Sequence, residues 1–77
     1  MTRTQIENAL SLTISTELSC EVEVMVADDV TVYCEPSSAD AVKALLAKTK
    51  TMKFVREHDW TGTDDMGNLC YQISYSF

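Results

Sequence analysis

The stretch "CEVEVMVADDVTVYCE" (Cys20–Glu35) decides the fold. Apolar and polar residues alternate through both of its halves, which is the pattern of β-strands with one buried face. With Ala27, Asp28 and Asp29 as a three-residue loop, the apolar rows of both halves lie on one face. With Asp28 and Asp29 alone as the turn, the two rows would face opposite sides. We therefore predict a hairpin with a loop of three residues, or five, whose last position is left-handed.

Helical patterns precede this hairpin and follow it. Thr4–Glu7 has the spacing of a capping box, and apolar residues at helical spacing then predict a first helix from about Gln5 to Glu17. Ser37–Asp40 has the same form and stands before a second amphipathic pattern, which predicts a helix from about Ser38 to Lys50. Each helix is thus followed by strand-forming sequence.

The C-terminal part predicts a second hairpin. "MKFVREHDW" (Met52–Trp60) is strand-like, and "NLCYQISYSF" (Asn68–Phe77) alternates most regularly of all. The residues expected on its buried face are Leu69, Tyr71, Ile73, Tyr75 and Phe77. The order is α-β-β-α-β-β, so we predict one α+β domain over residues 1–77. Its four-stranded antiparallel sheet should carry both helices on its apolar face and leave the other face open to solvent or to a partner.

Charge is distributed in blocks along this chain of 77 residues and net charge −6. Residues 1–42 hold eight acidic side chains and one basic one, residues 43–56 hold five basic and no acidic, and residues 57–77 hold four acidic and no basic. An acidic chain repels the phosphates of nucleic acids, whereas it can attract a basic protein surface. The basic segment is expected to pair with nearby acids rather than to bind nucleic acid directly.

Several classes of protein do not fit the sequence. No apolar run approaches the roughly 18 residues of a membrane span, and the N-terminus lacks the apolar core of a secretory signal. Cys20, Cys34 and Cys70 have no regular spacing, so we expect reduced thiols in a cytoplasmic protein rather than disulfides or a zinc site. No cofactor-binding motif is present, and a chain this short rarely encloses a deep catalytic pocket.

The first candidate site is the outward face of the first hairpin. Its members are Glu21, Glu23, Met25, Tyr33 and Glu35, with Asp28 and Asp29 in the loop. Strand alternation places the strand residues on one surface, where the carboxylates could meet Arg or Lys side chains of a partner. The alternative is a solvated strand face whose acids keep an edge strand from pairing wrongly.

The second candidate site is the stretch between the last two strands. It contains His58, Asp59, Trp60, Asp64, Asp65 and Cys70. Their spacing matches no known metal site and no calcium loop, and the pair of His58 and Cys70 lacks an oxyanion-hole loop. Alternation with Met52, Phe54 and His58 favours a core position for Trp60. If Trp60 is exposed instead, it is a natural binding anchor beside Asp64 and Asp65.

In size, acidity and lack of a catalytic motif the chain resembles small phage-encoded inhibitors of host defence, in particular anti-CRISPR proteins. These inhibitors share no common fold or motif, so no residue role is carried over. The resemblance implies a protein that docks on a CRISPR-type effector in the cytoplasm of a bacterial host and blocks the Lys and Arg groups that hold DNA. The alternative is a homodimeric structural or regulatory module of a phage or bacterium. A third class, an enzyme, would need a pocket that gathers His58, Cys70 and a carboxylate.

Overall fold

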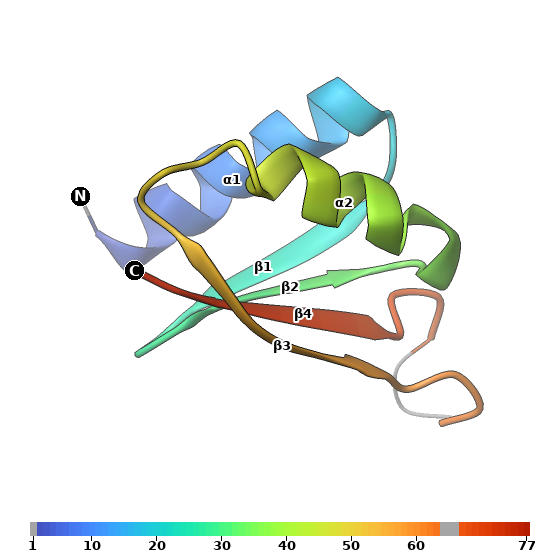
Figure 1. Ribbon diagram of the computed structural model, residues 1–77. Coiled ribbons are helices and arrows are strands. Elements are labelled where there is room, and N and C mark those ends of the chain that lie inside the picture. Colours follow the sequence, from blue (N-terminus) through green and yellow to red (C-terminus); the bar gives the residue numbers. More distant parts are fainter. Residues whose placement is uncertain (1, 64–66) are drawn as a thin grey trace.

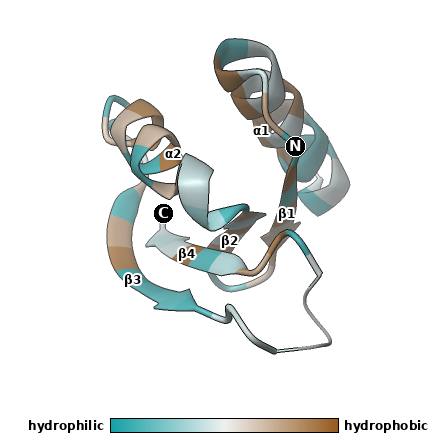
Figure 2. Ribbon diagram, turned by 90° about the vertical axis from the view of Figure 1, so that its right-hand side faces the viewer, coloured by the Kyte–Doolittle hydropathy of each residue, from teal (hydrophilic) through white to brown (hydrophobic). Residues whose placement is uncertain are grey.

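The computed structural model describes residues 2–63 and 67–77 and has the expected α+β architecture (Figure 1). The elements in chain order are α1 (Arg3–Leu18), β1 (Val22–Val26), β2 (Val30–Cys34), a 3₁₀ turn (Pro36–Ser38), α2 (Ala39–Leu46), β3 (Lys53–Asp59) and β4 (Tyr71–Ser76). The four strands form one antiparallel sheet in the order β1-β2-β4-β3. Both helices lie on one face of this sheet, α1 on the side of β1 and α2 toward β3 (Figures 1 and 2).

The first hairpin confirms the three-residue loop. Val26 pairs with Val30 and Val22 with Cys34, so the apolar residues of both strands line up on the helix-covered face. The loop is closed by the Ala27 N–H, which donates to the Asp29 carbonyl over 3.0 Å. The prediction that Asp29 is left-handed was wrong. Among the described non-glycine residues a positive φ occurs only at Ser19, the C-cap of α1.

The first predicted capping box lies elsewhere in the structure, and the second does not form. The box of α1 lies two residues earlier, where the Thr2 hydroxyl accepts from the Gln5 N–H and the Gln5 side chain accepts from the Thr2 N–H. At α2, Ser38 makes no capping hydrogen bond with its side chain, because Pro36 starts a 3₁₀ turn that leads directly into the helix. Capping motifs marked the helix starts only approximately.

The second helix is shorter than predicted. It ends at Leu46, and the following amides bond three residues back, Lys48 to the Leu45 carbonyl and Thr49 to that of Leu46. This tightening reflects the segment of residues 48–51, which alternates lysine with β-branched threonine, a poor helix former. The sheet is therefore covered by α2 over little more than two turns of helix.

The core lies between the helices and the inner face of the sheet. Its fully buried members are Ile14 of α1, Val30, Val32 and Cys34 of β2, Val42 of α2 and Ile73 of β4. Strand alternation predicted β4 in part: Ile73 and Tyr75 are buried, whereas Phe77 is 62% exposed beyond the end of the strand. Ser74 points to the opposite face and is nevertheless fully buried, because β4 is a central strand and its cross-strand neighbours Thr31 and Arg56 flank it.

Candidate functional site

The uncovered face of the sheet carries one continuous row of polar and aromatic side chains. Glu23 pairs with Tyr33 across β1 and β2, Tyr33 with Gln72 across β2 and β4, and Gln72 with His58 across β4 and β3. Residues that pair directly across antiparallel strands project on the same side of the sheet. The row ends at Trp60, just beyond β3. We call Glu23, Tyr33, Gln72, His58 and Trp60 the outer row.

Trp60 belongs to this surface and not to the core. Its side chain is 36% exposed, and its indole N–H donates to Gln72 Oε1 over 2.9 Å. The ring meets His58 edge to face, with 4.3 Å between ring centroids. Two partners therefore hold the indole at the end of the outer row, where its remaining surface faces solvent.

A β-bulge explains why alternation placed Trp60 wrongly in the core. Phe54 pairs with Tyr75 on the inner face, and the bulge at Val55 inserts an extra residue before Arg56 pairs with Ser74. The alternation therefore changes phase within β3, and His58 lies on the outer face with Gln72. No signal in the sequence marks this bulge.

The turn after β3 fixes the backbone of Trp60. The Trp60 N–H donates to the Cys70 carbonyl over 2.7 Å, and its carbonyl accepts from the Thr63 N–H over 2.9 Å. Asp59 stabilises the same turn, because the Thr61 N–H and hydroxyl both donate to its carboxylate. The hydroxyl of Thr61, followed by its N–H, lowers the pKa of Asp59, so this carboxylate stays charged at neutral pH.

The predicted acidic residues divide into two groups. Glu21 and Glu35 are exposed and directly flank the Val22–Cys34 pair, at the end of the sheet where the outer row lies. Asp28 and Asp29 lie beyond the other end of β1, a strand that itself spans roughly 13 Å. Asp64 and Asp65 lie outside the described residues. The structure thus gathers Glu21, Glu23, Tyr33, Glu35 and Trp60, and separates the Asp28–Asp29 loop from them.

The Asp28–Asp29 loop is also less available for binding a partner. Asp29 lies 3.9 Å from Arg56 Nη1, an ion pair that joins the first hairpin to β3 across the outer face. Both side chains are substantially exposed, so the pair contributes little to stability. Its effect is on the charge pattern: among the described residues Glu21, Glu23 and Glu35 have no ion-pair partner, whereas Asp29 in the loop is paired with Arg56.

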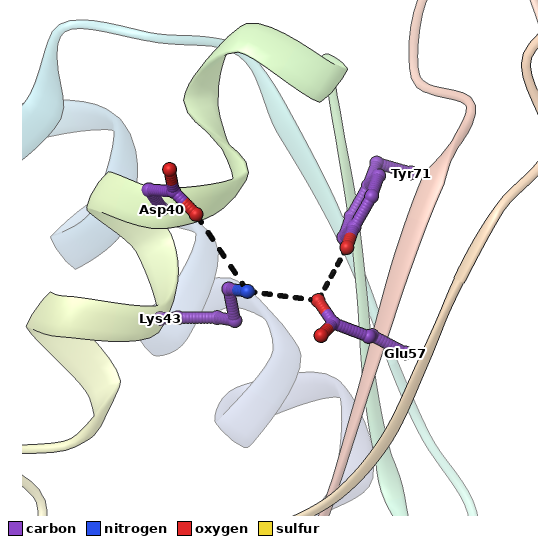
Figure 3. Close-up of polar contacts among 4 residues, drawn as sticks. All are labelled: Asp40, Lys43, Glu57 and Tyr71. Carbon is purple, nitrogen blue, oxygen red and sulfur yellow. Dashed lines mark hydrogen bonds and ion pairs between the residues drawn. The ribbon is translucent and has the colours of Figure 1, made fainter.

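A second polar network lies on the helix-covered side and was missed by the sequence analysis. Lys43 Nζ of α2 lies 2.9 Å from Glu57 Oε2 of β3 and 3.6 Å from Asp40 Oδ1, while the Tyr71 hydroxyl donates to the same Glu57 oxygen (Figure 3). These bonds, first that of Tyr71 and then that of Lys43, lower the pKa of Glu57, and Glu57 in turn raises the pKa of Lys43. The network ties α2 to β3 and β4, residues far apart in the sequence.

The protonation state of the buried titratable groups indicates a structural rather than a catalytic role. Burial raises the pKa of Cys34 to about 11 and that of Tyr75 to about 12, so both stay neutral at physiological pH. A thiol held in this form is a poor nucleophile. All three cysteines are free thiols at the same end of the sheet: Cys34 pairs with Val22 and with Tyr71, and Cys20 and Cys70 stand just before these two residues in the chain.

The described members of the second candidate cluster lie close together but are held by packing and turn contacts. His58 faces outward beside Trp60, Asp59 bonds Thr61, and the Cys70 sulfur lies 3.5 Å from the Thr61 hydroxyl. Within residues 2–63 and 67–77, no three His, Cys, Asp or Glu side chains are grouped so that they could hold a metal ion. In the same ranges, no helix is both long and apolar enough to cross a membrane.

Comparison with known proteins adds no relative: no protein-family model, no curated protein and no solved structure matches the chain. The geometry of the outer row and its charges are therefore the features that indicate a function.

Proposed function

We propose that this protein is a small acidic inhibitor that binds another protein through the uncovered face of its sheet. The target is the basic surface of a nucleic-acid-binding effector of the CRISPR type, and binding blocks access of nucleic acid to that surface. The proposal includes no catalytic role and no cofactor, and it places the action in the cytoplasm of a bacterial host cell.

The observation that carries the proposal is the outer row with its acidic flank. Tyr33 and Trp60 offer rigid aromatic area, and such residues supply much of the binding energy of protein interfaces. Glu21, Glu23 and Glu35 add three carboxylates at the same end, none of them in an ion pair with a described residue. Nucleic-acid channels are lined by Lys and Arg, so a fixed set of carboxylates can occupy them in place of phosphates.

A matched pair of charge reversals tests the proposal. Glu23→Lys changes the centre of the acidic flank, and Glu17→Lys makes the same change at an exposed position of α1, on the other layer. Guide-loaded CRISPR nucleases would be assayed for target-DNA binding with each protein. We expect the unaltered chain and Glu17→Lys to inhibit alike, and Glu23→Lys to inhibit roughly ten-fold less. Equal inhibition by both variants, or none by the unaltered chain with any effector, contradicts the proposal.

Identifying the target comes first. Tagged protein would capture partners from a lysate of its native host at low and at moderate salt, followed by mass spectrometry. Retention of a nucleic-acid-binding complex that weakens with salt is expected, because the contact is mainly electrostatic.

A homodimeric structural or regulatory module is the second candidate, and one observation favours it. The edge strand β3 is exposed at all of its positions, including Phe54 and Val55. A second copy could join this edge. Sedimentation equilibrium gives the mass in solution, and a monomer at micromolar concentration would remove this candidate.

A further inference from the structure

The two edges of the sheet differ in how they are protected. At β1, the Val26 N–H donates to Glu7 Oε2 of α1 over 2.8 Å, so the helix covers part of this edge. At β3, every residue is exposed, with Phe54 at 52% and Val55 at 45%. Apart from the pairing with β4, no backbone hydrogen bond from a described residue reaches Lys53–Asp59. The outer side of β3 therefore presents free N–H and C=O groups.

A cleft of about 510 Å³ lies between α2 and β3 on the helix-covered side. Its walls include Lys43, Ala47, Lys53, Phe54 and Glu57. It exists because α2 ends at Leu46 and leaves the inner side of β3 uncovered. Its volume falls in the range of ligand sites, and most of its lining is apolar.

We propose that β3 accepts an extended acidic peptide as a fifth strand, whose inward apolar side chains enter the cleft between α2 and β3. In this mode of recognition, main-chain hydrogen bonds along the edge supply affinity, and pockets for alternate side chains supply specificity. A strand added about 4.8 Å beyond β3 would lie against the exposed side chain of Phe54 and along the mouth of the cleft.

Charge selects the kind of peptide. Lys43 and Lys53 line the cleft and belong to the basic segment of a chain whose net charge is −6. Lys43 is already bonded to Glu57, whereas Lys53 makes no ion pair with a described residue. An acidic side chain of the peptide would supply the missing partner of Lys53.

Although the exposure of β3 would admit a second copy of this chain, two other features of this edge weigh against it as the occupant. The bulge at Val55 interrupts a flat ladder, and Lys53 and Arg56 on the edge are typical of strands that resist pairing with themselves. The proposal does not depend on the outer row, which lies on the opposite face of the sheet.

The test uses a fluorescein-labelled synthetic peptide of alternating glutamate and valine, compared with one of alternating lysine and valine. Binding is measured by fluorescence anisotropy, and the contact is mapped by amide hydrogen exchange in NMR. Lys53→Glu reverses the free charge, and Ala47→Trp fills the cleft from an exposed position. Lys48→Glu is the control, because Lys48 lines a groove on the other side of α2.

The acidic peptide is expected to bind saturably and to protect the amides of β3. Lys53→Glu should weaken binding roughly five-fold or more, Ala47→Trp should abolish it, and Lys48→Glu and Glu23→Lys should leave it unchanged. Absence of binding, equal binding of the lysine peptide, or protection mapped to the outer row would overturn the proposal. So would a dimer of the unaltered chain that Lys53→Glu dissociates, since β3 would then serve a second copy. The unchanged Glu23→Lys result keeps this test separate from that of the proposed inhibitor function.

Discussion

Replacement of Trp60 by alanine distinguishes a surface anchor from a core residue. In the structure, the substitution removes one exposed hydrogen bond, to Gln72, and one edge-to-face contact, with His58. An exposed hydrogen bond contributes about 0.5–1 kcal/mol and an aromatic pair about 0.5–1 kcal/mol. We therefore expect these two contacts to account for about 1–2 kcal/mol of the loss in the free energy of unfolding, to which the buried part of the indole adds. A tryptophan in the core would cost about 3–5 kcal/mol.

Urea unfolding followed by far-UV circular dichroism measures this difference, since the signal does not depend on the indole. A domain of this length has a total stability of about 4–12 kcal/mol, so the variant should remain folded with an unchanged m-value. Trp60→Phe is the control, because it keeps a ring beside His58 and loses only the N–H donor. A loss at the upper end of the core range, about 5 kcal/mol, for Trp60→Ala would refute the surface assignment. A folded variant that no longer inhibits the effector would identify Trp60 as a binding residue.

Three further predictions address packing, pH and the strand edge. Ile14→Ala should lower the free energy of unfolding by about 2–5 kcal/mol and Ile14→Val by about 0.5–1.5 kcal/mol, because Ile14 is fully buried between α1 and the sheet. Urea unfolding measures both losses, and equal small losses would contradict the docking of α1. The pKa of Glu57 is lowered in the folded state, so its contribution to stability is present above its unfolded pKa and is lost as pH falls through the folded value. The free energies of unfolding of Glu57→Gln and of the unaltered chain should therefore converge in acid. A constant difference between them across pH would count against the network of Figure 3. Deletion of Val55 removes the bulge and leaves a flatter edge, so sedimentation should show more self-association than for the unaltered chain. An unchanged mass would mean that the bulge does not protect β3 from pairing with a second copy.

The acidic flank of the outer row and the cleft beside α2 lie on different faces of the sheet. Glu21, Glu23 and Glu35 lie on or beside the outer face of the first hairpin, while Lys43 and Lys53 line the cleft on the helix-covered side. Two partners could bind without competing for the same face of the sheet. The tests of the two proposals therefore use different variants and give independent answers.

The register of the first hairpin followed from the sequence because a strand has a side-chain period of two. A shift by one residue would move every valine of β1 to the solvent side, so one loop length was strongly favoured. The same reasoning predicted the order of elements and the placement of both helices on one face. It also predicted that Glu23 and Tyr33 would project together on the uncovered face.

Neighbours across strands were decided only by the tertiary structure. The sequence does not state that β4 lies between β2 and β3, and that order alone brings Tyr33, Gln72 and His58 into one row. Likewise, Lys43 meets Glu57 because α2 is packed over this half of the sheet. Such contacts between distant residues leave no local pattern from which they could be read.

Trp60 shows most clearly where local reasoning ends. Alternation alone placed its side chain in the core, yet one extra residue at Val55 changes the phase of β3 and turns His58 to the outer face. A bulge is favoured by the packing of the whole sheet and has no residue type of its own here. The sequence by itself determined the strands and their apolar faces, because alternation is local; the tertiary structure decided which side of the sheet the aromatic anchor occupies, because that depends on how β3 pairs with β4.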